Sequence, residues 1–330
     1  MRLAIFQLGN GRYTPAVLTH AGAWQILHGV GPCAENQKVD PAGFLTSPEA
    51  YEVFLKTELR MFLLDQDARR HVGLEQGAQK GFAPLLLGSK YAPPCGVPRS
   101  FRDFYAFEQH VKTARAKRGL DMIPAWYEVP VFYFSNPGSL IGHEQPVYAP
   151  HGSHELDYEL ELGVIIGKGG KDIPPEKAWE HVAGFTIVND LSARDVQRQE
   201  MSVGLGPAKG KDFATAVGPY LVTLDEFQDK IDQNGRVDLE MTARVNGKEL
   251  SRGNVQSMYH SWPKLIAHAS ADAELFPGDL LGSGTVGTGC ILELGPENTG
   301  SWLKPGDVVE LEIERLGVLR TPVVARPDGT

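Results

Sequence analysis

The sequence is poor in cysteine, and the few cysteines are far apart. It holds 3 in 330 residues, Cys33, Cys95 and Cys290, with no CxxC spacing. Cysteines this sparse and this widely separated indicate neither a disulfide framework nor a thiolate cage for a metal. They are typical of a protein kept in a reducing compartment, so we expect a cytoplasmic location.

Long apolar runs are also missing. No stretch approaches the roughly 18 residues needed to cross a bilayer. The longest runs, such as residues 83–87, have the length of a buried strand. The N-terminus carries one arginine and a short apolar stretch at residues 3–6, which is too little for a secretory signal. We therefore expect neither a membrane span nor a signal peptide.

Positive charge is the third shortage, with 32 Lys and Arg residues against 41 Asp and Glu and a formal net charge of −9. Such a chain lacks the basic surface that binds phosphates, so neither nucleic acid nor an anionic membrane is expected as a partner. The nucleotide-binding patterns GxGxxG and GxxxxGKS/T and the GxSxG of serine hydrolases are absent. The remaining composition, 42% hydrophobic and 22% charged, is that of an ordinary globular protein.

The best domain boundary is the segment YAPPCGVP at residues 91–98, because proline and glycine block both regular structures. We expect a small N-terminal domain over residues 1–95, with strands and one helix that starts at Ser47-Pro48. A larger, catalytic domain is expected over residues 96–330.

A second helix is predicted from Ser100, with Asp103 in its first turn and Lys117-Arg118-Gly119 at its end. In that helix Asp103 and His110 would lie two turns apart on one face, about 10.5 Å from each other. One metal ion could not take both as ligands across that distance. One of the two could be a metal ligand while the other acts on the substrate. Alternatively, His110 is an ordinary surface or core histidine.

Beyond residue 130 the pattern is mostly strand and turn. Residues 239–245 alternate, and Asn246-Gly247 after them is a strong hairpin turn. The segments Pro277-Gly278-Asp279 and Pro305-Gly306-Asp307 both read as turns that lead into a buried strand. One further helix is predicted over residues 174–182.

The segment LDYELELGVII at residues 156–166 is the strongest local signal for chemistry. As a single strand it would place Asp157, Glu159 and Glu161 on one face, with successive acids about 6.6–7 Å apart. One interpretation is a solvated face of a half-buried strand. The other is a site for an oxygen-preferring cation such as Mg²⁺, Mn²⁺ or Ca²⁺.

Further polar residues follow or flank buried segments. Asp190 ends the apolar run 183–188, where an acid is costly unless it is paired, bound to metal or used to cap the next turn. Lys211 follows the glycine-containing stretch 204–210, which allows close approach to a ligand or forms a mobile lid. The loop histidines His151 and His154 precede the acidic segment, but an all-oxygen site does not need them.

Seven motifs in order resemble the fumarylacetoacetate hydrolase family over roughly residues 98–325. They are DFYAFEQH (103–110), VPVFY (129–133), LDYELEL (156–162), IVNDLSARDVQ (187–197), GKDFAT (210–215), GSGT (282–285) and LEL (292–294). The first block makes the chain more similar to the fumarylacetoacetate hydrolase type than to the short acylpyruvase type.

The resemblance implies an α+β fold that is mostly β, a roll of strands with a small N-terminal β/α domain, and a homodimer. It implies a divalent cation, Mg²⁺ or Ca²⁺ with Mn²⁺ also possible, held by Asp103, Glu159, Glu161 and Asp190. His110 falls on the catalytic histidine, Glu293 on the acid that orients it, and Lys211 on a position near the ion. The positions that contact substrate in the family are Tyr105, Tyr133, Gln197 and Thr285. Four carboxylates exceed the charge of one dication, and Lys211 is the expected compensation.

The chain departs from the family pattern at two places. Met201 stands where the family has a second tyrosine, in a stretch one residue longer. The substrate-binding arginine that follows the family's histidine has two candidates here, Arg115 and Arg118.

The function that the resemblance implies is metal-dependent hydrolysis of a carbon–carbon bond in a β-diketo acid, such as fumarylacetoacetate or an acylpyruvate, in aromatic amino acid catabolism. The metal would polarise the diketo group while His110 activates a water. The same chemistry serves isomerases, hydratases and decarboxylases of 2-oxo acids, which are the nearest alternatives. From other classes, a non-catalytic β protein with structural Ca²⁺ and a scaffold with a degenerate site stay open.

Overall fold

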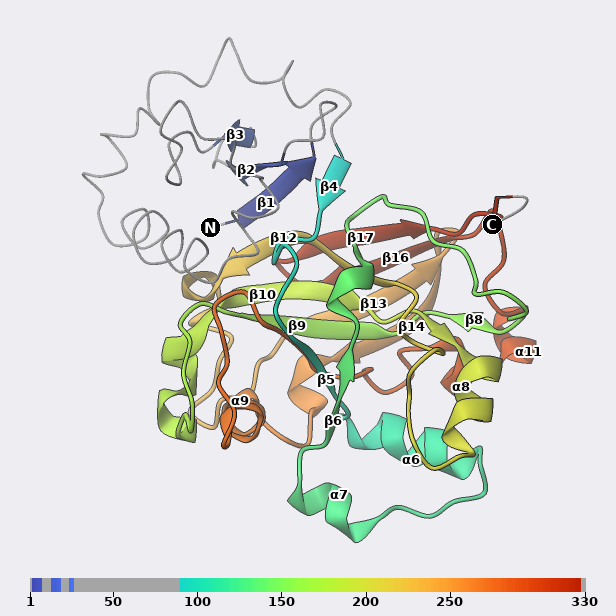
Figure 1. Cartoon of the computed structure of the whole chain (residues 1–330), viewed down its shortest axis with the longest axis horizontal. Helices are drawn as coiled ribbons and strands as arrows, with labels where there is room; N and C mark the ends of the chain where they lie inside the picture. Colours follow the sequence, from blue (N-terminus) through green and yellow to red (C-terminus); the bar gives the residue numbers. More distant parts are fainter. Residues whose placement is uncertain (1, 8–12, 19–23, 27–89, 328–330) are drawn as a thin grey trace.

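The computed structural model describes residues 2–7, 13–18, 24–26 and 90–327 (Figure 1). The helix predicted from Ser47 lies outside these residues. Within the described part, no helix is long and apolar enough to cross a membrane.

Eleven strands form the larger of the sheets: β1 (Arg2–Gln7), β2 (Tyr13–Leu18), β3 (Trp24–Ile26), β4 (Lys90–Ala92), β5 (Phe101–Phe104), β6 (Phe132–Ser135), β7 (Leu140–Ile141), β9 (Leu160–Ile166), β10 (Val182–Asn189), β12 (Thr215–Thr223) and β15 (Leu280–Gly282). Their order is β3-β2-β1-β12-β10-β9-β15-β5-β6, with β4 paired to β1 and β7 to β12. Leu3 on β1 pairs with Leu221 on β12, so N-terminal strands extend the sheet that carries the predicted site. The division into domains 1–95 and 96–330 stays a prediction.

A second sheet of four strands packs on the first. It contains β13 (Glu240–Val245), β14 (Lys248–Asn254), β16 (Val308–Ile313) and β17 (Gly317–Pro322), in the order β14-β13-β16-β17. Strand β13 contacts β9, and both β16 and β17 contact β10, so the sheets form two layers (Figure 1). Apolar side chains from both layers, among them Leu162, Phe185 and Leu311, are buried in one core cluster. A separate pair of short strands joins β8 (Leu156–Asp157) to β11 (Ser192–Ala193).

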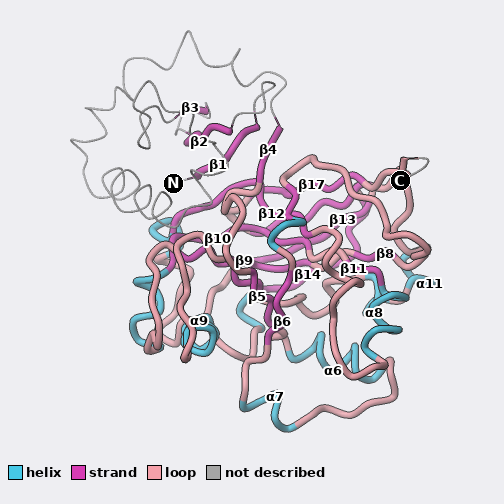
Figure 2. Tube along the Cα trace, in the orientation of Figure 1, coloured by secondary structure: helices cyan, strands magenta, loops and turns pink. Residues whose placement is uncertain are grey.

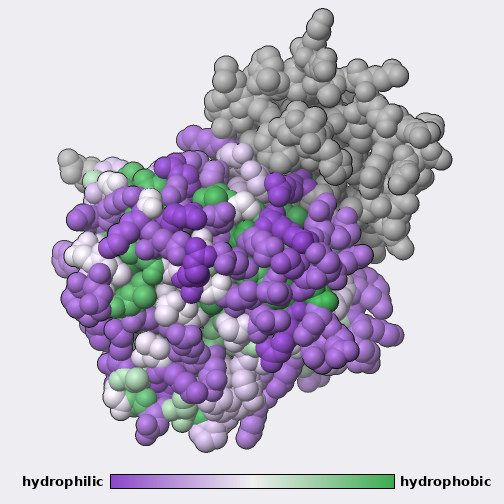
Figure 3. All heavy atoms as spheres, turned by 180° about the vertical axis from the view of Figure 1, so that it is seen from behind, coloured by the Kyte–Doolittle hydropathy of each residue, from purple (hydrophilic) through white to green (hydrophobic). Residues whose placement is uncertain are grey.

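Helices are short and lie at the margins of the sheets (Figure 2). They are α6 (Glu108–Ala116), α7 (Pro124–Glu128), α8 (Arg194–Met201), α9 (Trp262–Ser270), α10 (Ile291–Leu294) and α11 (Pro296–Thr299), with 3₁₀ turns at Pro137–Ser139, Pro175–His181, Leu224–Phe227 and Val255–Ser257. The face seen in Figure 3 is mainly hydrophilic in its described part, with small separate apolar patches. This arrangement confirms the predicted mostly-β α+β class. The helix predicted over residues 174–182 is a 3₁₀ helix.

The predicted turns of the C-terminal half are confirmed. Asn246 and Gly247 have φ of 53° and 77° and join β13 to β14, as an Asn-Gly hairpin requires. In the two Pro-Gly-Asp turns the carboxylate accepts a backbone N–H three residues earlier, from Phe276 to Asp279 and from Lys304 to Asp307. These turns lead into β15 and β16, so the repeated Pro-Gly-Asp sequence forms the same type of turn at both places.

The helix predicted from Ser100 is wrong in its first half. Residues Phe101–Phe104 form strand β5, with all four side chains buried, and helix α6 begins only at Glu108. The cause is non-local, because β5 pairs in parallel with β15 and antiparallel with β6, and these pairings override the local helical spacing. The predicted helix end is confirmed, since Gly119 has φ of 69° just after the last turn. Asp103 and His110 therefore lie on different elements.

The single strand predicted over residues 156–166 is also wrong. It is divided into β8 and β9, which pair with different partners, β11 and β10. Asp157 on β8 is thereby separated from Glu159 and Glu161. The solvated-face interpretation is wrong as well, because these three acids are at most 5% exposed.

Candidate active site

Three carboxylates from distant parts of the chain meet inside the large sheet. Asp103 lies on β5, Glu161 on β9, and Asp190 directly after β10. Ligand oxygens of these three side chains lie within 4.8 Å of one another, and each residue is at most 2% exposed. The site thus brings acids from three sequence motifs to one point.

This group carries more negative charge than its surroundings balance. Burial first, and then the neighbouring carboxylates, raise the pKa of Asp103 and of Glu161 well above their ordinary values. One oxygen of Glu161, Oε2, is buried and receives no hydrogen bond from an N–H or hydroxyl group of the described residues, and the carboxyl of Glu161 interacts with that of Asp103. An orphaned buried oxygen beside two further carboxylates fits a divalent cation that prefers oxygen ligands.

The space between the acids is kept clear by a glycine. A Cβ on Gly282 of β15 would lie 2.3 Å from Oδ1 of Asp103 and 3.0 Å from Oε2 of Glu161. Any other residue would displace one of the two carboxylates. The first position of the GSGT motif, residue 282, therefore requires glycine, because a side chain there would displace a carboxylate.

The carboxylate of Glu159 is paired with two basic side chains of the protein. Its Oε2 accepts a hydrogen bond of 2.5 Å from Nζ of Lys211, and its Oε1 lies 2.7 Å from Nη2 of Arg194. Burial alone would raise the pKa of Glu159, but the charges of Lys211 and Arg194 outweigh it and hold that pKa well below the ordinary value. Of the four predicted ligands, Asp103, Glu161 and Asp190 form one group, called the close group below. The fourth, Glu159, is paired with Lys211 and Arg194 instead.

Lys211 joins Glu159 to the close group. Its Nζ also donates to Oδ2 of Asp190 at 2.6 Å, and the lysine is buried. Burial would lower the pKa of Lys211, but Asp190 and Glu159 raise it, so the ammonium stays charged. The compensating charge expected from the sequence is thus in place. Tyr133 and Thr215 complete the shell of Asp190, each donating its hydroxyl to a carboxylate oxygen.

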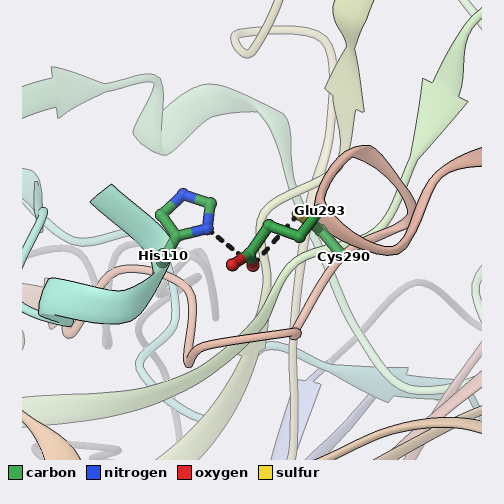
Figure 4. Close-up of side chains that lie close together, drawn as sticks. All are labelled: His110, Cys290 and Glu293. Carbon is green, nitrogen blue, oxygen red and sulfur yellow. Dashed lines mark hydrogen bonds and ion pairs between the residues drawn. The ribbon is translucent and has the colours of Figure 1, made fainter. Parts of the chain in front are cut away.

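His110 and Glu293 form a buried pair near these acids. Nδ1 of His110 on α6 lies 2.8 Å from Oε2 of Glu293 on α10 (Figure 4). The other oxygen of Glu293 accepts the backbone N–H of Thr288 at 3.2 Å. The ring of Tyr105 meets that of His110 edge to face, with centroids 5.3 Å apart. A carboxylate that holds Nδ1–H leaves Nε2 of the imidazole free to accept a proton.

His110, Cys290 and Glu293 form a second group whose possible ligand atoms lie within 4.8 Å of one another. These side chains already satisfy each other, since Sγ of Cys290 donates to Oε2 of Glu293 at 3.5 Å. Burial raises the pKa of Cys290 well above its ordinary value, so the thiol keeps its proton. A protonated thiol is a poor ligand, and the carboxylate group fits a cation better.

A buried ion pair that the sequence pattern did not reveal supports both groups. Nε of Arg194 donates to Oδ2 of Asp157 at 2.8 Å, and Asp157 accepts the backbone N–H groups of Ile291 and Leu292 at 2.7 and 3.0 Å. Asp157 thereby fixes the start of α10, which carries Glu293. The available signal was an arginine next to a buried apolar strand, which needs a partner to be buried.

The other predicted residues are distributed around this centre. Thr285 Oγ1 lies 3.5 Å from Oε1 of Glu161, and Oε1 of Gln197 accepts from Nη1 of Arg194 at 3.0 Å. Burial raises the pKa of Tyr105 to about 12. His151 and His154 are exposed, and His151 lines a different cavity beside Leu303 and Arg326.

The two candidate arginines after His110 differ in their surroundings. Nε of Arg115 donates to the carbonyl oxygen of Asp121 in the adjoining loop. Arg118 lies close enough to Tyr105 for its charge to oppose the rise of that phenol's pKa. Of the two, Arg118 is the one whose charge reaches the candidate site.

Comparisons with known proteins show the family to which the chain belongs. The model of the family described as fumarylacetoacetate (FAA) hydrolase C-terminal matches residues 99–324, and the chain belongs to this family. It is 38% identical over 203 residues to oxaloacetate tautomerase FAHD2A, mitochondrial, of Homo sapiens, which covers 59% of each protein. It is 28% identical over 284 residues to fumarylacetoacetase of Arabidopsis thaliana, covering 70% of this chain and 64% of that one. The chain thus spans less than two thirds of either relative's length.

The solved structure of fumarylacetoacetate hydrolase from psychrophilic Exiguobacterium antarcticum is similar over 99% of this chain and 100% of that chain, with a TM-score of 0.68 and 26% identity. The fold is therefore that of the family. The family is one of enzymes, and its members include hydrolases and a tautomerase.

Proposed function

We propose that this protein is a metal-dependent hydrolase that cleaves a carbon–carbon bond in a β-diketo acid, such as fumarylacetoacetate or an acylpyruvate. The observation that carries the proposal is a buried His110–Glu293 pair beside a buried group of three carboxylates. The two are linked through Glu159, which interacts with His110 and is hydrogen-bonded to Lys211, the partner of Asp190. A base beside a cation site is the arrangement that hydrolysis of a carbonyl compound needs.

Asp103, Glu161 and Asp190 would hold the cation, with Glu159 as the fourth ligand of the proposed set. When bound, a divalent ion polarises adjacent oxygens of the substrate and stabilises the negative charge of the departing carbon. Mg²⁺ or Ca²⁺ is the proposed ion and Mn²⁺ a further candidate, because all three prefer carboxylate oxygens.

His110 acts as the general base. Glu293 holds its Nδ1–H, so Nε2 takes a proton from a water as the water oxygen bonds to the substrate carbonyl carbon. The carbonyl π electrons move to oxygen, where Lys211 and the amide of Gln197 stabilise the charge. As the carbonyl re-forms, the carbon–carbon bond breaks. The released carbon takes the proton that His110 removed from the water, which gives two acids and restores the neutral imidazole.

Tyr105, Tyr133 and Thr285 would contact the substrate. The Tyr105 ring packs against His110. The hydroxyls of Tyr133 and Thr285 donate to the carboxylates of Asp190 and Glu161, respectively. These contacts place aromatic surface and hydroxyl groups around the proposed reaction centre. They suit a planar, oxygen-rich substrate.

The test compares His110→Ala with wild type and with His151→Ala, which changes an exposed loop histidine. Loss of enol absorbance is followed for fumarylacetoacetate, acylpyruvates and oxaloacetate, with Mg²⁺ or Mn²⁺ supplied. His110→Ala should lose about 10²–10⁴-fold in rate while cation binding by calorimetry is retained. Full turnover by His110→Ala would refute the proposed base.

A second candidate function is tautomerisation or isomerisation of a 2-oxo acid, with decarboxylation as a variant. The identity of 38% to an oxaloacetate tautomerase favours it. There the same base would move a proton between carbon and oxygen without adding water. Product analysis separates the reactions, since hydrolysis gives two acids, tautomerisation an isomer and decarboxylation CO₂.

A non-catalytic Ca²⁺-binding role is the alternative from another class. EDTA should then lower the melting temperature although no substrate is turned over, whereas for the enzyme EDTA stops turnover and added cation restores it. We also propose a cytoplasmic homodimer, and light scattering on the purified protein measures its mass.

A further inference from the structure

We propose that Cys290 is a positioning residue, whose thiol proton holds the oxygen of Glu293 that receives the His110 N–H. This inference rests on the proposed function of the His110–Glu293 pair. It assigns a role to a buried side chain that the proposed mechanism leaves unused.

The geometry concentrates two donors on one oxygen. Oε2 of Glu293 accepts from Nδ1 of His110 at 2.8 Å and from Sγ of Cys290 at 3.5 Å (Figure 4). Figure 4 shows the carboxylate between the imidazole on one side and the thiol on the other. With the Thr288 N–H on Oε1, the buried carboxylate has three donors that fix its rotation.

The backbone around Cys290 is held independently of that contact. Cys290 directly precedes α10, whose first two N–H groups bind the carboxylate of Asp157. Asp157 is in turn paired with Arg194. Since Cys290 and Glu293 leave the same anchored turn, the thiol adds orientation of the side chain to an already fixed backbone.

The thiol suits this role because it is a proton donor and a weak one. Burial first, and then the negative charges of Asp157, Glu293 and Glu159, raise the pKa of this fully buried thiol against the opposing charge of Arg194, so the proton stays on sulfur. An S–H group donates more weakly than a hydroxyl. It therefore steadies Oε2 while leaving most of the carboxylate charge to the imidazole.

The variants are Cys290→Ala, which removes the donor, and Cys290→Ser, whose shorter C–O bond keeps a donor slightly farther from Glu293. The matched control is Cys95→Ala. Cys95 is also a fully buried free cysteine, whose thiol donates to the carbonyl oxygen of Gly96, so this variant measures the general effect of losing a buried thiol. Melting temperature, kcat, KM and the pH profile of kcat/KM are measured for each with the cation supplied.

Cys290→Ala should lower kcat about 10-fold, the effect of losing a side chain that orients a functional group, with KM unchanged. The acidic midpoint of kcat/KM should move to higher pH, because the unshielded carboxylate stabilises the imidazolium. Cys290→Ser should lie between Cys290→Ala and wild type. Cys95→Ala should match wild type in kcat and in pH profile.

Two results would overturn the inference. One is a Cys290→Ala enzyme that behaves like Cys95→Ala, and the other is a lower kcat that follows the melting temperature with the acidic midpoint unmoved. The proposed function fails separately, if His110→Ala or Glu293→Gln keeps full activity. Loss of activity in those two variants with no effect at Cys290 contradicts the positioning role alone.

Discussion

Gly282 on β15 lies opposite Asp103 on β5, and the missing side chain of the glycine is the space that the Asp103 carboxylate fills. The two residues are partners in the parallel register of these strands. A Cβ at position 282 would come within 2.3 Å of Oδ1 of Asp103 and 3.0 Å of Oε2 of Glu161. The glycine thus allows a backbone and two carboxylates to meet at one point.

We predict that Gly282→Ala weakens cation binding at least about 10-fold. The added methyl forces one carboxylate out of position, and divalent ions depend on ligand number and placement. Titration calorimetry with Mn²⁺ measures the change. The control is Gly138→Ala, where a Cβ would meet only a side-chain oxygen of Asn136 at 3.2 Å. Equal Mn²⁺ affinity in Gly282→Ala and wild type would contradict the proposed centre.

The pH dependence of stability gives a second prediction. Asp103 and Glu161 have pKa values raised well above the ordinary 3.8 and 4.5, so the cation-free folded state binds protons that the unfolded chain has released. Without cation, stability therefore falls as pH rises above these ordinary values. A bound cation takes the place of the protons.

The rise in melting temperature on adding Mg²⁺ or Mn²⁺ should consequently be larger at pH 8 than at pH 5. Thermal denaturation with EDTA and with excess cation, at both pH values, measures it. The Gly282→Ala protein should show a much smaller difference. An ion-induced rise that is the same at pH 5 and pH 8 would show that the cation does not replace those protons.

The third prediction separates Glu161 from Glu159. Glu161→Ala should abolish cation occupancy, because Glu161 offers an unpartnered oxygen to the close group. Glu159→Ala should also reduce occupancy, and in addition it leaves Lys211 and Arg194 without a shared acid. Breaking a buried ion pair from one side destabilises a protein by about 3–5 kcal/mol.

Elemental analysis after dialysis gives the occupancy, and chemical denaturation gives the free energy of unfolding. Glu159→Ala should be the less stable of the two in cation-free buffer. The proposed centre would have to be abandoned if Glu161→Ala retained full stoichiometry. Equal stability of the two variants would contradict the stabilising role given to the ion pairs of Glu159 with Lys211 and Arg194.

The ordered sequence motifs contain Asp103, Glu161 and Asp190, and these three carboxylates do lie together in the structure. The sequence could not predict the elements that carry them from local spacing alone. Ser100 and the apolar residues after it have a helical pattern, yet residues Phe101–Phe104 join the sheet, because β15 arrives from far along the chain to pair with them. Pairing of this kind is decided by tertiary contacts.

The same limit applies to Asp157 and Arg194. A period of two placed Asp157 on the face of Glu159 and Glu161, but its partners are an arginine 37 residues away and the N–H groups of Ile291 and Leu292. A run of acidic residues in a sequence does not reveal which carboxylate accepts hydrogen bonds from backbone N–H groups. Burial of an arginine was the signal that a dedicated acid was needed.

The last prediction concerns the two arginines that the sequence left as alternatives. In both arginines Nε donates to a backbone carbonyl oxygen, of Asp121 for Arg115 and of Ala114 for Arg118. Arg118 is the exposed one, and its charge acts on the phenol of Tyr105. The terminal nitrogens of an exposed guanidinium at the edge of the site can bind a substrate carboxylate. Arg118→Ala should therefore raise KM for a diketo acid about 10-fold and leave kcat nearly unchanged, since binding contacts that are equal in ground and transition states affect KM alone. Arg115→Ala should keep the wild-type KM and lose only some stability of the loop. Steady-state kinetics on both variants decides between them, and the reverse pattern would assign the substrate carboxylate to Arg115.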